Sequence, residues 1–372
     1  MTPNSISVVA GAPGAGARAV VQRVFGEPRF HTAGDLMALT FAPDGSIWSV
    51  EEPGILRKWD VNSGQDLQQQ PVSDLETLWV FSADARLLAS ASDDLTLWDI
   101  AKGQVVATVP QDSWVTTAVF GAANRPGTES PPLATGHDDG KIRLWDAATA
   151  MLIHELPGHE LPVSALAFNP DGTKLASAGE DRIIHLWDVQ SGKLLRSLRG
   201  HTDRIPALAW HPREQQLVSA GWDTTARVWN ANTGEPIILL NSHADQVNVL
   251  AFSPDGRLLA CGDSADSIHV WDPANWKTIH VLRGQGEEEI RALAFDRSGQ
   301  RLASGGTARV IRLWDIREGR ILAGEDGHVR HAIGVAAGPN GARLASNCGG
   351  AALRVWDAAE AKNVLHVEAN GG

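Results

Sequence analysis

The segment Lys141-Ile142-Arg143-Leu144-Trp145-Asp146 decides the fold. As a β-strand it places Ile142 and Leu144 on one face and Arg143 and Trp145 on the other. Similar segments recur along the chain, each with a tryptophan at the same place: Trp59, Trp98, Trp145, Trp187, Trp229, Trp271, Trp314 and Trp356. Successive tryptophans are 39 to 47 residues apart. Such a period indicates one supersecondary unit repeated eight times.

The fourth repeat shows the unit most clearly. It contains an apolar strand at 163–168, an Asn-Pro-Asp-Gly turn, a second strand at 174–178, the tryptophan strand at 183–188 and a fourth strand at 194–198. The first of these strands is apolar on both faces, so each sheet has to be covered by its neighbours on both sides. With no helix-length segment between the sheets, we predict an all-β fold: a single eight-bladed β-propeller of four-stranded antiparallel blades.

Charge and cysteine content limit the classes of function. The chain of 372 residues carries a net charge of −12, which argues against a nucleic-acid binder and suits a basic partner. Its two cysteines fall in nonadjacent repeats, so the fold does not depend on a disulfide and the redox compartment stays open. No apolar run is long enough to span a membrane, and no signal peptide is recognisable. We expect a cytoplasmic protein with no membrane contact.

The N-terminal part differs from the repeats. Residues 1–17 are predicted to be a flexible leader, and 18–372 to form the propeller. The glycine-rich stretch 11–17 superficially resembles a phosphate loop, but Ala17 and Arg18 stand where lysine and serine or threonine are required. Eight blades need eight outer strands, and the sequence offers nine candidates, counting the strand-like segments 19–25 and 363–367 at the two ends.

Four features of the repeats resemble the WD-repeat β-propeller family: the Gly-His opening, the Pro-Asp-Gly turn, the Leu-Ala-Ser strand and the closing Trp-Asp. The resemblance covers about 340 residues and is specific for fold rather than for function. It implies that an N-terminal strand, here at 19–25, joins the last blade and closes the ring, with closure by the C-terminal strand at 363–367 as the alternative. It also implies a hydrogen-bonded tetrad of histidine, serine, aspartate and tryptophan within a blade. Two repeats match in full: His159, Ser177, Asp181 and Trp187, then His201, Ser219, Asp223 and Trp229.

The other repeats depart from this pattern. In the third, Gln111 stands at the histidine position, and in the sixth, Cys261 replaces serine and Ala265 replaces aspartate. The first, seventh and eighth repeats lack the aspartate, having Pro53, Ala308 and Gly350 there. We therefore expect the middle blades to be the most rigid. The complete sets contain the residue types of a Ser-His-Asp triad, but a place between packed strands argues for a structural role.

The resemblance also implies a binding face. It places the loops before each aspartate, and the positions just before each innermost strand, on one rim where partners usually bind. On these loops Trp222 is the best candidate for a binding hot spot, with packing over its own tetrad as the alternative, and Glu180 holds the same place one repeat earlier. The second set of candidate partner-binding residues is Trp114, Arg204, Gln246, Glu289 and His331.

Two classes of function remain. The first is a non-catalytic protein-interaction scaffold whose rim loops bind other proteins, with the acidic run 287–289 able to receive a basic segment. The alternative is a propeller enzyme or ligand sensor with a site at the central channel. The innermost strands carry packing residues such as those at 165–168 rather than a convergent polar set, which favours the scaffold. We predict no cofactor and no metal, since His137 and Asp139 lack a second ligand cluster.

Overall fold

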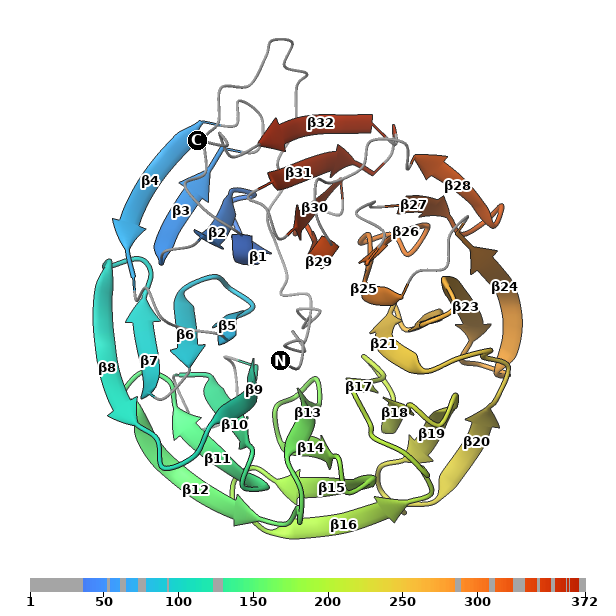
Figure 1. Cartoon of the computed structure of the whole chain (residues 1–372), viewed down its shortest axis with the longest axis horizontal. Helices are drawn as coiled ribbons and strands as arrows, with labels where there is room; N and C mark the ends of the chain where they lie inside the picture. Colours follow the sequence, from blue (N-terminus) through green and yellow to red (C-terminus); the bar gives the residue numbers. More distant parts are fainter. Residues whose placement is uncertain are drawn as a thin grey trace.

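Eight four-stranded antiparallel sheets stand around a central axis as the blades of a propeller (Figure 1). The computed structural model describes residues 36–51, 54–60, 65–72, 78–91, 94–122, 130–284, 289–307, 312–323, 332–339, 342–348, 352–358, 360 and 362–367. Within these ranges, no helix is long and apolar enough to cross a membrane. The eight sheets confirm the predicted eight-bladed architecture.

Each blade is formed by four strands that are consecutive in the chain and ordered from the axis outward. Blades 1 to 4 consist of β1 (Leu36–Phe41), β2 (Ile47–Glu51), β3 (Ile55–Trp59) and β4 (Asp66–Pro71); β5 (Leu78–Phe81), β6 (Leu87–Ala91), β7 (Asp94–Asp99) and β8 (Gln104–Pro110); β9 (Val115–Phe120), β10 (Pro132–His137), β11 (Lys141–Asp146) and β12 (Met151–Pro157); and β13 (Val163–Phe168), β14 (Lys174–Gly179), β15 (Ile183–Asp188) and β16 (Leu194–Arg199). Blades 5 to 8 consist of β17 (Ala207–Trp210), β18 (Gln216–Ala220), β19 (Ala226–Asn230) and β20 (Pro236–Leu240); β21 (Val247–Phe252), β22 (Leu259–Asp263), β23 (Ser267–Asp272) and β24 (Lys277–Arg283); β25 (Ile290–Phe295), β26 (Arg301–Gly306), β27 (Arg312–Asp315) and β28 (Arg320–Ala323); and β29 (Ala332–Ala337), β30 (Arg343–Cys348), β31 (Ala352–Asp357) and β32 (Lys362–Val367).

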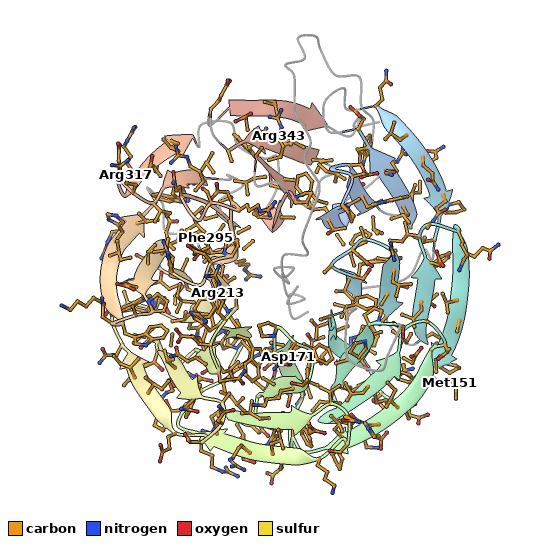
Figure 2. The ribbon with its side chains drawn as sticks, turned by 180° about the vertical axis from the view of Figure 1, so that it is seen from behind. Met151, Asp171, Arg213, Phe295, Arg317 and Arg343 are labelled. Atoms are coloured by element: carbon orange, nitrogen blue, oxygen red, sulfur yellow. The ribbon has the colours of Figure 1, made fainter. Side chains whose placement is uncertain are left out.

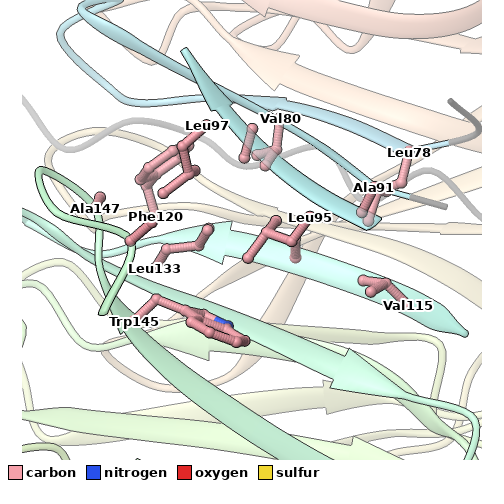
Figure 3. Close-up of a cluster of buried hydrophobic side chains, with 13 residues drawn as sticks. Leu78, Val80, Ala91, Leu95, Leu97, Val115, Phe120, Leu133, Trp145 and Ala147 are labelled. Carbon is pink, nitrogen blue, oxygen red and sulfur yellow. The ribbon is translucent and has the colours of Figure 1, made fainter. Parts of the chain in front are cut away.

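The hydrophobic core lies between the blades, and the repeated tryptophan is its main component. Trp145 of blade 3 packs with Leu95 and Leu97 of blade 2, as Figure 3 shows, and Trp187 of blade 4 packs in the same way with Leu144 of blade 3. A buried tryptophan removes about 150–250 Å² from water, which corresponds to roughly 4–6 kcal/mol. Each blade is therefore stabilised by the burial of its tryptophan against the apolar side chains of the preceding blade.

The ring closes through the same contact. Trp59 of blade 1 packs against Leu353 and Val355 of blade 8, so the first blade covers the last. The outer strand of blade 8 is β32, which pairs with β31. The C-terminal strand thus takes the place that we predicted for a strand at 19–25. That segment and the predicted leader 1–17 lie outside the described residues.

Among the described residues, most of the exposed large apolar side chains lie on the outer strands. Met151 on β12 is 68% exposed and lies at the outer edge of the ring in Figure 2, whereas Phe295 on β25 is buried on the inner side. Within every blade the pairing of the third and fourth strands shifts register just before the repeated tryptophan, as between Leu186 and Trp187. Such a bulge bends the strand locally.

Candidate functional site

The tetrad residues of blade 4 form a continuous hydrogen-bond network. His159 Nδ1 lies 3.0 Å from Asp181 Oδ2, and His159 Nε2 lies 2.8 Å from Ser177 Oγ, which accepts the indole N–H of Trp187 at 2.9 Å. A carboxylate only accepts, so the imidazole proton belongs on Nδ1, and Nε2 accepts from the serine hydroxyl. The N–H groups of His159 and Trp187 and the hydroxyl of Ser177 therefore each have an acceptor within the network.

Blade 5 repeats this geometry. His201 lies 2.9 Å from Asp223 and 2.8 Å from Ser219, which again accepts the indole N–H of Trp229 at 2.9 Å. Burial acts to raise the pKa of Asp223, but hydrogen bonds from His201, Thr225 and a backbone amide outweigh it and hold that pKa well below its ordinary value. The carboxylate is therefore an ionised structural acceptor, which is not the state a general acid needs.

A second histidine extends the network of blade 4. His185 on β15 lies beside His159, with ring centroids 4.5 Å apart. Its Nδ1 is 2.9 Å from Ser197 Oγ and its Nε2 is 2.8 Å from the carbonyl oxygen of Gly158. Burial, together with the neighbouring His159, lowers the pKa of His185 to about 4. The ring is neutral at physiological pH.

Blade 3 has a histidine that the sequence pattern did not reveal. Gln111 stands at the expected position, and its amide donates to the carbonyl of Val109 instead. The imidazole comes from His137, at the end of β10, whose Nε2 lies 2.9 Å from Thr135 Oγ1, the acceptor of the Trp145 N–H. Burial lowers the pKa of His137 to about 4.

Blade 6 has a carboxylate that the pattern also missed. Ala265 stands at the expected aspartate position, yet His243 has an acidic partner: its Nδ1 lies 3.0 Å from Asp263 Oδ2, and both side chains are fully buried. Cys261 occupies the serine position. Burial, followed by the nearby charge of Asp263, raises the pKa of the Cys261 thiol.

His137 and Asp263 share one place in the repeat, two residues after the central hydroxyl or thiol. The complete tetrads have Gly179 and Gly221 there, where a Cβ would lie 2.9 Å or less from both the histidine and the aspartate. When the tetrad histidine and aspartate are both present, this position requires glycine. When one of them is missing, the position has room for a side chain. Loss of this glycine is the sequence signal that could have identified both residues.

The central bond varies among the other blades. The indole N–H reaches a serine at 2.7 Å in blade 1, 2.8 Å in blade 7 and 3.4 Å in blade 8. In blade 2 the indole nitrogen of Trp98 and the hydroxyl of Ser90 are both buried without a partner. The hydrogen bond between serine and tryptophan is therefore missing in this blade.

The two sets of predicted partner-binding residues are joined by backbone hydrogen bonds. The amides of Asp138, Glu180, Trp222, Ser264 and Thr307 donate to the carbonyls of Trp114, Pro162, Arg204, Gln246 and Glu289, respectively. Each bond fixes a loop between second and third strands against the residue that precedes the innermost strand. We call the face where the innermost strands begin the entry rim. His331 lies outside the described residues.

Trp222 belongs to a three-residue cluster on the entry rim. The guanidinium of Arg204 lies over its ring at 5.1 Å from the centroid and forms an ion pair with Glu180 of the preceding blade at 3.0 Å. Trp222 is half-buried, and its indole nitrogen is buried without a partner. The cluster links blades 4 and 5.

Trp114 is the more exposed of the two rim tryptophans. Its side chain is 43% exposed, and its carbonyl holds the Asp138–Gly140 loop, which also packs against the backbone of Leu161, a residue that is 48% exposed. Gln246 is half-buried, and Glu289, which precedes β25, pairs with Arg291 on that strand. Of the predicted residues that the structure describes, Trp114 is therefore the exposed apolar one, and Leu161 of the next blade, which was not predicted, is exposed as well.

Two family models match the sequence. The model described as the IFT122 first β-propeller matches residues 162–371, and the model described as the WD domain, G-beta repeat, matches residues 103–146. The first match alone covers more than half of the 372 residues.

Similar proteins include Mitochondrial division protein 1 of Vanderwaltozyma polyspora (28% identity over 31% of this chain), human Angio-associated migratory cell protein (26% over 40%) and Nuclear distribution protein PAC1 of Arthroderma benhamiae (32% over 32%). The matches span only 21%, 35% and 30% of these relatives' own lengths. The crystal structure of the computationally designed Ika8 protein is similar with a TM-score of 0.77 and 25% identity, covering 88% of this chain and 97% of that one. From the eight blades, their tetrads and the family models together, the chain belongs to the WD-repeat β-propeller family.

Proposed function

We propose that this chain is a non-catalytic protein-interaction scaffold that binds a partner segment on the entry rim of blades 3 to 5. The observation that carries the proposal is the exposed apolar pair Trp114 and Leu161, 43% and 48% exposed on either side of the Asp138–Gly140 loop. Neither side chain is needed for the core between the blades. A large aromatic side chain beside a structured loop is the type that dominates binding energies at interfaces.

The charges around this pair favour a basic partner. The rim of blades 3 to 6 exposes a series of acidic residues: Asp112, Asp138, Asp139, Glu160, Asp203 and Asp245. Of the cations on the same loops, Arg182 is exposed, whereas Arg204 is already paired with Glu180. A segment with an apolar anchor for the Trp114 surface and lysine or arginine beside it would match both features.

A catalytic or sensing site at the central channel has less support. Two hydroxyls on the innermost strands are used between blades: Thr116 donates to the carbonyl of Val163 at 2.6 Å, and Ser164 donates to the carbonyl of Ile205 at 2.7 Å. These bonds join the inner walls of neighbouring blades, so the hydroxyls serve packing.

The test is selection of peptides from a random displayed library on the immobilised chain. We expect enrichment of peptides that combine a large apolar residue with lysine or arginine, and at least about tenfold weaker binding to Trp114→Ala. Trp222→Ala, which removes the ring over which the Arg204 guanidinium lies, is expected to weaken binding less than Trp114→Ala. The matched control is Trp276→Gly, which changes a tryptophan on the opposite rim. Equal losses in the control, or peptides indifferent to Trp114, would refute the proposed surface.

A further inference from the structure

Blade 5 contains an arginine whose charge the chain does not neutralise. Arginine stands two residues before the repeated tryptophan in five blades, as Arg57, Arg143, Arg227, Arg312 and Arg354. In blades 1, 3 and 7 it has an acidic partner, in the pairs Arg57–Asp66 at 2.8 Å, Arg143–Glu155 at 3.2 Å and Arg312–Asp266 at 3.1 Å. With the residues that the structure describes, Arg227 forms neither an ion pair nor a hydrogen bond, and its Nε is buried without an acceptor.

The strand pairing explains why Arg227 has no counter-charge. Arg143 lies opposite Glu155 on β12, whereas Arg227 lies opposite Leu239 on β20. Directly opposite residues share one face of a sheet, so blade 5 has an aliphatic side chain where blade 3 has a carboxylate. Asp223, four residues before Arg227, accepts hydrogen bonds within its tetrad instead. The half-buried guanidinium of Arg227 is therefore free to bind an external anion.

The outer strand of the same blade is unusual as well. Of the eight outer strands that the structure describes, β20 is the one without a polar side chain: it consists of Pro236, Ile237, Ile238, Leu239 and Leu240. Ile237 and Leu239 are each 44% exposed, and β20 is the last strand of its sheet, at the circumference of the ring in Figure 1. Edge strands are normally protected by charged residues, so an exposed aliphatic edge favours contact with another chain.

The two features lie side by side and suit a partner that is both acidic and apolar. We propose that the outer face of blade 5 binds an acidic segment of a partner protein, in which a carboxylate pairs with Arg227 and adjacent aliphatic side chains cover Ile237 and Leu239. The carboxylate takes the role that Glu155 has beside Arg143 in blade 3. An arginine–carboxylate pair adds geometric specificity, and the aliphatic contacts around it exclude water.

This surface is separate from the entry-rim surface of the proposed function. Trp114 precedes β9 of blade 3 and Leu161 precedes β13 of blade 4, whereas Arg227 and Leu239 lie on the two outer strands of blade 5. The two surfaces also select opposite charges, since the rim is acidic and Arg227 is a cation. Either surface can therefore fail to bind without consequence for the other, and a chain with both can hold two different partners.

The experiment starts from the full chain carrying Trp114→Ala, so that the entry-rim surface does not contribute. Peptides from a random displayed library are selected on this protein and counter-selected on the same protein with Leu239→Glu. The added glutamate copies the Arg143–Glu155 pair of blade 3, so that the chain neutralises Arg227 itself. We expect the enriched peptides to contain aspartate or glutamate next to leucine, isoleucine or valine.

Fluorescence anisotropy with one enriched synthetic peptide then measures affinity for the wild-type chain and its variants. Arg227→Ala should weaken binding at least about tenfold. Replacing the peptide's carboxylate with an amide should weaken binding to the wild type by a similar factor and leave binding to the variant nearly unchanged, because the two groups act as a pair. The matched control is Arg213→Ala, which removes an exposed arginine on the opposite rim of blade 5 and should bind like the wild type.

Circular dichroism establishes that each variant is folded, and Arg227→Thr, with the residue type of blade 2, replaces Arg227→Ala if that variant is not. The proposal is overturned if the selection enriches no acidic peptides, or if a folded Arg227 variant binds the enriched peptide as tightly as the wild type. A wild-type chain that is dimeric in gel filtration, and that Leu239→Glu makes monomeric, would assign this face to a second copy and would equally overturn the proposal.

Discussion

Blades 4 and 6 have histidines at the same two positions, yet only one of them completes its hydrogen bonds. In blade 4, Ser177 connects Trp187 with His159, and every imidazole nitrogen is occupied. In blade 6, a thiol stands at the serine position, and two ring nitrogens have no partner. The comparison teaches that the tetrad acts as a unit, because the hydroxyl at its centre serves both the histidine and the tryptophan.

The largest expected effect comes from removing that hydroxyl. Ser177→Ala leaves the Trp187 N–H and the His159 Nε2 buried without partners, so we expect a loss of about 2–5 kcal/mol of unfolding free energy. The control Cys261→Ala should cost no more than about 1 kcal/mol, since no oxygen-centred bonds are lost. Urea unfolding followed by tryptophan fluorescence measures both. Equal losses would mean that the thiol already performs the serine's role.

Acid should destabilise the protein through its buried neutral histidines. The pKa of His185 is lowered from 6.5 to about 4 in the folded chain. As the pH falls from about 6.5 towards 4, the unfolded chain takes up a proton that the folded chain refuses, so stability is lost in that window. Between pH 8 and pH 5 the loss is about 2 kcal/mol for this one group.

The measurement is the unfolding free energy of wild type and His185→Arg at pH 8 and pH 5. Arginine does not titrate in this range, so the variant should lose about 2 kcal/mol less than the wild type between the two pH values. His137 and His269, whose pKa values are also about 4, keep part of the acid sensitivity in the variant. Parallel pH profiles would contradict the assignment of His185 as a buried neutral group.

The fold could be predicted from the sequence because the repeated tryptophan marks the same strand in every blade. In blade 4 the strands at 163–168 and 183–188 have the predicted bounds, and the other two extend one residue further. Periodicity does not tell which terminal strand, 19–25 or 363–367, completes the last blade. The outer strand of blade 8 is β32, which pairs with β31.

The site was less predictable because alignment of the repeats assumes that each tetrad side chain always comes from the same position of the repeat. In blades 3 and 6, His137 and Asp263 enter the network from two residues after the central side chain. Only the three-dimensional closeness of that place to the histidine and the aspartate, visible at Gly179, explains the substitution. The spacing of the repeats also could not show that the Arg204 guanidinium lies over the Trp222 ring, because this contact depends on the side-chain conformations of both residues.

Converting blade 6 towards blade 4 should stabilise the chain. Cys261→Ser supplies a hydroxyl that can donate to His243 Nε2 and accept the N–H of Trp271, so we expect a gain of about 1 kcal/mol. The reciprocal variant Ser177→Cys should lose a similar amount. Thermal unfolding measures both changes. A loss in Cys261→Ser would show that the packing of the thiol outweighs the hydrogen bonds.

The smallest effect is expected at a turn where blade 6 again departs from blade 4. Trp276 has φ +56°, in the left-handed region, where blades 4, 5 and 7 have Gly192, Gly234 and Gly319. It is partly buried against the apolar cluster between blades 5 and 6. Trp276→Gly relieves about 1 kcal/mol of backbone strain and loses a comparable amount of apolar contact. The net change in unfolding free energy should therefore stay below about 1 kcal/mol, and a loss well above that value would show that indole packing, rather than the turn, determines the conformation of this segment.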